Sequence, residues 1–148
     1  RGNEAKTAGG GMAIGDSEYV RVSGSTFIDN NGAEGGGILC ALSENITIEQ
    51  STFTSCKGFR GSAIKLTSVT AVIIQHNNLV GNVANSGGAL YLLDSDNVHT
   101  FNNEYDGNIA ENLYGSAIAI LHSNDTVIRG SYFNNNSSPN DGGTVYWT

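Results

Sequence analysis

A short small-residue motif recurs along the chain at an almost constant interval, and this repeat limits the fold more than any other feature. The motif starts at Gly9, Gly35, Gly61, Gly87, Gly115 and Gly142. The intervals between starts are 26, 26, 26, 28 and 27 residues, and each of the first five starts is followed 18 residues later by Phe, Tyr or Leu. A period of this length indicates a stack of similar units that bury their apolar faces against one another.

Within each unit, apolar residues alternate with period two, which is the pattern of a half-buried β-strand. One alternating pair follows the glycine motif, such as Ile38 and Cys40, and a second pair comes later, such as Ile46 and Ile48. The aromatic position, Phe53 in this unit, adds a third inward point. We therefore expect two or three short strands in each unit, joined by tight corners.

The repeat predicts an all-β fold, a right-handed single-stranded parallel β-helix of about 5.5 rungs, each 26–28 residues long. We expect residues 1–148 to form one domain or segment, with rungs starting near residues 9, 35, 61, 87, 115 and 142. An antiparallel β-sandwich is the alternative, but it predicts turns every ~8–12 residues without a long period. Three residues after the aromatic position, the predicted internal ladder contains Asn30, Asn82, Asn108 and Asn136, with Cys56 in one place.

Composition excludes several classes of protein. The chain has 20 Gly and 18 Asn in 148 residues, which disfavours helices, and its 14% charged residues and 39% hydrophobic residues are not typical of disorder. Seven basic residues against 14 acidic ones argue against nucleic-acid binding. No apolar run reaches the ~20 residues of a membrane-spanning helix, and we expect no cofactor.

The two repeated motifs resemble those of the polymorphic membrane protein family of autotransporter adhesins, which pairs Gly-Gly-Ala-Ile with Phe-x-x-Asn. Residues 87–90 read Gly-Gly-Ala-Leu, residues 61–64 and 115–118 read Gly-Ser-Ala-Ile, and Phe27 and Phe133 each precede an Asn by three positions. This resemblance implies a parallel β-helix. It also implies a secreted or surface-displayed module that serves in adhesion or as a structural spacer.

The first functional hypothesis is therefore a non-enzymatic extracellular module. Because the sequence opens and stops inside rungs, we expect either a segment of a longer β-helix or a subunit that stacks end to end. The candidate assembly residues are Trp147, Tyr146 and Tyr91. Loops 107–114 and 134–141 are expected to be adjacent and to contact a glycan or a cell-surface partner.

The second hypothesis is a fragment of a polysaccharide-active enzyme of the lyase, hydrolase or epimerase type. The repeat places Asp94 beneath His122 and Asp96 beneath Asn124, at the corner after the first strand of two successive rungs. A histidine next to a carboxylate could act in acid–base catalysis. The alternative is a solvated corner, because turns favour Asp, Asn and Ser for backbone reasons.

A second acidic group lies at the same corner of the first rungs. Glu18 and Glu44 share one position on adjacent rungs, with Asp16 near them. Stacked carboxylates could hold Ca²⁺ between rungs, or they could simply repel one another weakly in water.

Two further residue classes leave alternatives open. Cys40 and Cys56 both occupy inward positions, and they are either two buried thiols or one disulfide. Four sequons start at Asn45, Asn124, Asn135 and Asn136. For a protein secreted by a eukaryote, Asn45 and Asn124 are the preferred glycosylation sites, Asn135 is a further candidate, and Asn136 is a poor acceptor in the ladder.

Overall fold

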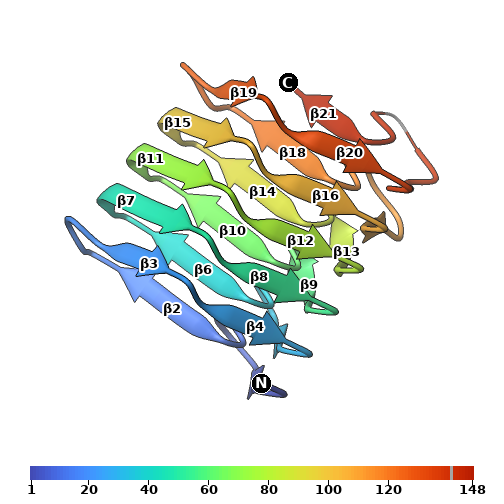
Figure 1. Ribbon diagram of the computed structural model, residues 1–148, viewed down its shortest axis with the longest axis horizontal. Coiled ribbons are helices and arrows are strands. Elements are labelled where there is room, and N and C mark those ends of the chain that lie inside the picture. The colour runs from blue at the N-terminus through green and yellow to red at the C-terminus, as the bar shows by residue number, and fades with distance from the viewer. Residues whose placement is uncertain (141) are drawn as a thin grey trace.

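Successive turns of the chain lie on top of one another and form a parallel β-solenoid (Figure 1). The computed structural model describes residues 1–140 and 142–148. In these residues every regular element is a strand, and every strand pairs in parallel with its counterpart in the next turn. The prediction of a parallel β-helix is confirmed. No helix that could cross a membrane occurs in the part of the chain that the structure describes.

Two sheets contain the two alternating apolar pairs that the sequence shows. Sheet B consists of β2 (Met12–Gly15), β6 (Ile38–Ala41), β10 (Ile64–Thr67), β14 (Leu90–Leu93), β18 (Ile118–Leu121) and β21 (Val145–Trp147). Sheet C consists of β3 (Arg21–Ser23), β7 (Glu44–Glu49), β11 (Thr70–Gln75), β15 (Asp96–Phe101) and β19 (Val127–Arg129).

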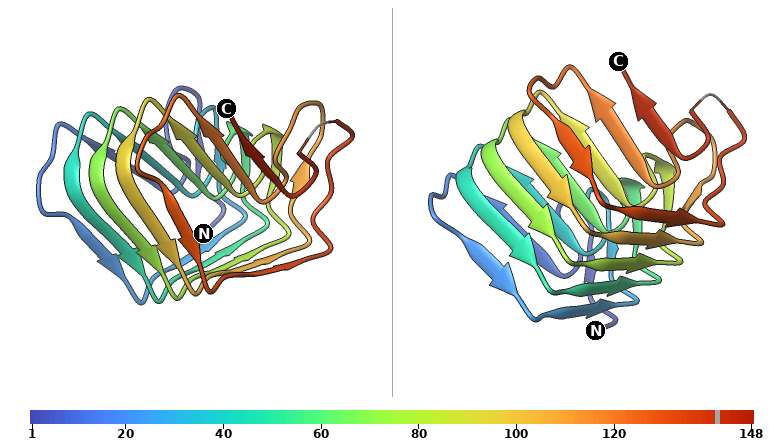
Figure 2. Two further views of the ribbon diagram at one scale, coloured as in Figure 1. Left: turned by 90° about the horizontal axis from the view of Figure 1, so that it is seen from above. Right: turned by 45° about the horizontal axis from the view of Figure 1, so that its top comes forward.

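Two further sheets complete each turn, and their strands are shorter on average. Sheet D consists of β4 (Thr26–Ile28), β8 (Thr52–Thr54), β12 (Asn78–Val80), β16 (Glu104–Asp106) and β20 (Tyr132–Asn134). Sheet A consists of β1 (Glu4–Ala5), β5 (Asn31–Gly32), β9 (Lys57–Arg60), β13 (Val83–Ser86) and β17 (Ile109–Ala110). The chain visits the sheets in the order A, B, C, D, and Figure 2 shows the four sides around the interior.

Each turn thus contains four strands, and the prediction of two or three is wrong. Sheet A was missed because its inward positions hold Gly32, Gly58, Ala84 and Ala110. These small residues let the backbone approach the interior closely, but they give no alternating apolar signal in the sequence.

The strand register equals the sequence repeat. Ile38 pairs with Ile64, Ile64 with Leu90, and Leu90 with Ile118, so equivalent positions form continuous columns. These columns make one buried hydrophobic core that runs through the turns. Because the units share one register, the same side chain types meet at every level.

Aromatic rings stack in the interior at the position 18 residues after each motif start. Phe27 and Phe53 are stacked with ring centroids 4.8 Å apart and an interplanar angle of 2°. Tyr105 and Phe133 stack at 5.0 Å and 7°. Leu79 pairs with both Phe53 and Tyr105 in sheet D, so the column is continuous between the two stacks.

The glycine motif marks a place where neighbouring turns approach closely. A Cβ atom added to Gly88 would lie 1.7 Å from the backbone oxygen of Ser116 in the next turn. Gly87 has a φ of 60°, a left-handed conformation that glycine adopts without steric cost. At Gly88 the bend between sheets A and B therefore leaves no room for a side chain, whereas Ser62 and Ser116 occupy the same motif position in two other turns.

Candidate functional site

Amide side chains at the corner between sheets D and A link three successive turns. Asn82 Nδ2 donates to the backbone oxygen of Phe53 and to Asn108 Oδ1, both at 3.0 Å, and Asn82 Oδ1 accepts from the backbone nitrogen of Cys56 at 3.0 Å. Asn108 makes the equivalent bonds to Leu79 and Asn136, at 2.8 and 3.0 Å. Every polar atom of these buried amides is thereby used to hold neighbouring turns together.

The amide column contains one more residue than the sequence predicts, Asn3. Asn3 donates to Asn30 Oδ1 from its backbone nitrogen and from Nδ2, each at 3.0 Å. Cys56 takes the amide's place in one turn, and its thiol lies 3.6 Å from the backbone oxygen of Phe27.

Two further polar columns were missed from the sequence. At the corner between sheets C and D, Ser51 donates its backbone N–H to Asn77 Oδ1 at 2.9 Å, and Asn77 donates its backbone N–H to Asn103 Oδ1 at 2.9 Å. At the corner between sheets B and C, Ser95 donates its backbone N–H to Ser123 Oγ at 3.1 Å. The 26-residue spacing of Ser25, Ser51, Asn77 and Asn103 was a usable signal. Serine is common at corners for other reasons, so it stands out less than an aromatic column.

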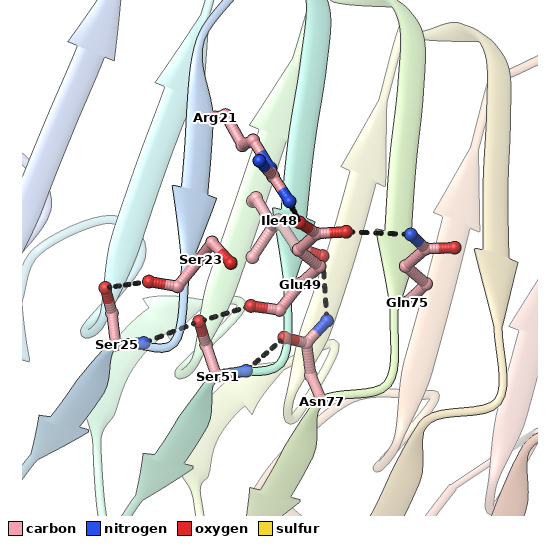
Figure 3. A network of polar contacts seen from close by, with 8 residues as sticks. All are labelled: Arg21, Ser23, Ser25, Ile48, Glu49, Ser51, Gln75 and Asn77. Atoms are coloured by element: carbon pink, nitrogen blue, oxygen red, sulfur yellow. Dashed lines mark hydrogen bonds and ion pairs between the residues drawn. The ribbon is translucent and has the colours of Figure 1, made fainter.

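A charged network lies on the outer face of sheet C, immediately before the corner between sheets C and D (Figure 3). Arg21 Nε donates to Glu49 Oε1 at 2.6 Å, and Gln75 Nε2 donates to Glu49 Oε2 at 2.8 Å. The Glu49 side chain is only 9% exposed although it projects from the outer face. The hydrogen bond from Gln75, together with that from Arg21, holds the pKa of the Glu49 carboxyl below its ordinary value.

The histidine–carboxylate group predicted from the sequence lies at the exposed edge between sheets B and C. His122 Nδ1 is 3.6 Å from Asp94 Oδ1, and the two side chains are 71% and 57% exposed. Asp96 instead accepts from Asn124 Nδ2 at 3.1 Å. The structure therefore brings His122 and Asp94 together, while Asp96 belongs to a separate contact.

The acidic residues predicted to bind calcium lie at the same edge of the first turns. The backbones of Glu18 and Glu44 form a parallel β-bridge, and the two residues line a hollow of about 430 Å³ together with Asp16. In the described residues, no group of three His, Cys, Asp or Glu side chains has the arrangement of a metal site.

Tyr91 requires a correction, because it is 4% exposed and is not part of an open assembly surface. The segments that lead into the glycine motifs fold over the outer face of sheet B, so a Cβ at Gly87 would lie 2.3 Å from the Tyr91 ring. Lys65, the neighbour of Tyr91 in the same column, is also buried there and forms an ion pair with Glu34. This burial comes from contacts between segments, which strand periodicity does not show.

The other two assembly candidates lie on β21. Tyr146 stacks on Tyr114, with ring centroids 3.8 Å apart, so its ring contacts a loop of its own chain. Trp147 is 54% exposed, and its column in sheet B is the one that includes the buried Leu92 and Ile120.

Comparisons with known proteins identify the architecture. The profile of the family described as the right handed β-helix region matches residues 1–104, which is more than two thirds of the chain. The chain belongs to this family. The family description agrees with the right-handed sense expected from the sequence. No curated protein and no solved structure matches the chain.

In this right-handed β-helix both cysteines are buried free thiols, and no disulfide joins them. Cys40 lies on β6 of sheet B and Cys56 at the corner between sheets D and A. Burial raises the pKa of both thiols, which lowers the fraction of reactive thiolate. The two-thiol alternative is therefore the one found.

The sequons occupy different environments on the β-helix. Asn124 and Asn135 are exposed, while Asn45 is half-buried at the start of β7. Asn136 belongs to the amide column, because its Nδ2 donates to the backbone oxygen of Tyr105 at 2.8 Å.

The two loops predicted to contact partners are neighbours at one edge of the β-helix. Asn140 Nδ2 donates to the backbone oxygen of Asn112 at 2.6 Å, and Ser138 Oγ donates to that of Leu113. Residue 141, at the end of the second predicted loop, lies outside the described residues. The first loop also contains β17, so its central part continues sheet A.

Proposed function

We propose that the chain is a non-enzymatic structural and adhesive β-helix module that acts outside the cell, either as a surface stalk or as a filament subunit stacked end to end. The supporting observation is the amide column of Asn82 and Asn108, in which each side chain bonds to the turns on both sides. Such a column resists separation of the turns, since each break exposes buried donors and acceptors.

The outer surface supports the same role. Outward positions in one column of sheet C carry Arg21, Thr47, Ile73, His99 and Val127. Each interior column keeps largely similar side chains from turn to turn, while this face changes at every turn. A scaffold of this kind can present different contact residues without altering its core. The motif resemblance to polymorphic membrane proteins favours adhesion or spacing as the use of that surface.

The assembly part of the proposal concerns the end turns. A strand edge without a neighbour can pair either with a further turn of the same protein or with another copy. Trp147 lies in an inward column and would be covered by such a strand.

Small-angle scattering and electron microscopy over a range of concentrations test this assembly. We expect particles one solenoid wide whose length grows with concentration, and we expect Trp147→Ser to reduce that growth. The control is Ile73→Ser, which removes a 38% exposed apolar side chain from β11, a strand between two others in the middle of sheet C. Compact particles that widen without lengthening would contradict end-to-end stacking.

The second candidate is a polysaccharide-active enzyme, and the observation that favours it is the His122–Asp94 pair at 3.6 Å. An exposed histidine next to a carboxylate can exchange protons with a bound substrate. Turnover of uronic-acid polymers that is abolished by His122→Ala would support this candidate. Turnover that survives this substitution would remove the pair from consideration, as would absence of turnover in the unaltered protein.

A further inference from the structure

The strand β9 places its large side chains outside the β-helix. Lys57 and Phe59 are exposed and alternate with Gly58, whose position faces inward. Phe59 is 52% exposed, which leaves much of an apolar ring in water. This strand therefore contributes little to the core, and its Lys57 and Phe59 side chains lie on the surface.

A hollow of about 560 Å³ lies over sheet A beside this ring. We define the sheet A groove by five of its lining residues: Asn31, Lys57, Phe59, Asn85 and Glu111. They come from β5, β9, β13 and the loop after β17, and β5, β9 and β13 are hydrogen-bonded neighbours. A second hollow of about 550 Å³ continues past Asn31 and Lys57 toward Asp29 and Ser55.

The groove combines one ring with polar groups of both signs. The Arg60 guanidinium lies 5.6 Å from the centroid of the Phe59 ring. Within the described residues, neither Lys57 nor Arg60 forms an ion pair with a carboxylate. Asn31 and Asn85 add side-chain amides, and Glu111 adds a carboxylate on the loop side of the groove.

We propose that the sheet A groove binds a carbohydrate. The proposal rests on the adhesive role proposed above and gives that role a site and a ligand class. The exposed Phe59 ring provides an apolar surface for the C–H face of a sugar ring. Lys57, Glu111 and the two amides provide hydrogen-bond donors and acceptors for hydroxyl groups, and the charged members make the stronger bonds.

The size and polarity of the groove favour this ligand over a second copy of the chain. A volume of about 560 Å³ lies in the range of ~300–1,000 Å³ that is usual for small-ligand sites. A protein interface is generally built on several large, adjacent apolar anchors. In this groove the one aromatic side chain is Phe59, and Val83 is a smaller apolar neighbour among the side chains of Asn31, Lys57, Asn85 and Glu111. Tyr91, one of the three aromatic residues predicted from the sequence to lie at an assembly surface, is buried, whereas Phe59 is an exposed ring that the sequence did not single out.

The test measures binding of the whole chain to a panel of soluble oligosaccharides, containing neutral hexose, pentose, amino-sugar and uronate chains, by calorimetry. We expect at least one to bind, and we expect Phe59→Ala to weaken that binding by about tenfold, or about 1.4 kcal/mol. Lys57→Gln should weaken the same binding. The matched controls are Tyr132→Ala and Arg129→Gln, an aromatic and a cation that are exposed on other sheets. Thermal unfolding verifies that each variant is folded.

Three results would overturn the proposal. They are no binding to any member of the panel, equal affinity of the Phe59→Ala variant, or equal loss in the Tyr132→Ala control. Concentration-dependent dimerisation that Phe59→Ala abolishes, without sugar binding, would assign the groove to a second copy instead. Failure of sugar binding leaves the stacking test unaffected, because that test depends on Trp147 and on particle length.

Discussion

Asn82 and Asn108, 26 residues apart, are joined by a 3.0 Å hydrogen bond from the amide nitrogen of the first to the amide oxygen of the second. Both side chains are completely buried. An amide has two donors and a carbonyl acceptor, so one residue can satisfy the turns above and below it. This relationship makes the amide column a measurable source of stability.

Replacing Asn82 with Ala should destabilise the protein strongly. The change leaves the backbone nitrogen of Cys56 and the backbone oxygen of Phe53 without their side-chain partner in the interior. An unsatisfied buried group costs ~1–3 kcal/mol, so we expect a loss of about 2–4 kcal/mol in the free energy of unfolding from urea titration. Asn78→Ala, at an exposed position on β12, is the control and should change it by less than about 0.5 kcal/mol. Similar losses in both variants would mean that the column is not the cause.

Replacing Cys56 with Asn should stabilise the protein, because the amide would restore the column in the turn where a thiol interrupts it. The new Nδ2 would donate to the backbone oxygen of Phe27, which the thiol approaches at 3.6 Å. We expect a gain of about 1 kcal/mol, the usual net value of one hydrogen bond, in the same urea titration. Cys40→Asn is the contrasting variant, since it puts an amide into the apolar interior of sheet B and should destabilise. A loss of stability in Cys56→Asn would show that this turn cannot accommodate the amide.

Glu49 should make the stability depend on acid pH. Its pKa is lowered in the folded protein by the hydrogen bonds from Gln75 and Arg21. The stabilisation is therefore complete above the ordinary glutamate pKa and is lost as the pH falls through the lowered value. Thermal unfolding across this acid range should show a steeper decline for the unaltered protein than for Glu49→Gln. Glu44→Gln, at the exposed start of the same strand, should keep the decline of the unaltered protein. Parallel curves for Glu49→Gln and the unaltered protein would contradict the role of this carboxylate.

The two thiols should react slowly while the protein is folded. Both are buried and both have a raised pKa, so little thiolate is accessible to a disulfide reagent near neutral pH. We expect two thiols to react rapidly in denaturant, and none at a comparable rate in the native state. Thr70→Cys adds an exposed thiol on β11 and should react at once in the native protein. Native cysteines that react as fast as this added thiol would show that the interior opens readily.

The sequence predicts the stacking of the turns well, because one register sets every column. Phe27 and Phe53 stack where the repeat places them, and His122 meets Asp94 across a 28-residue interval. It predicts less well what lies outside the sheets. Tyr91 is covered by segments that precede the glycine motifs, and Phe59 is left in the open on β9. Both outcomes depend on how connecting segments pack, which strand periodicity does not encode.

The longer units place their extra residues in the loops between the amide column and the next glycine motif, at one edge of the solenoid. Each strand bonds only to its counterparts in the adjoining turns. Inserting a copy of one unit would therefore replace one junction between turns with two, deleting a unit would do the reverse, and the contacts between all other turns would stay as they were. Gene segments that encode such units can be duplicated in tandem without changes to the core residues. The length of the solenoid can therefore evolve one turn at a time.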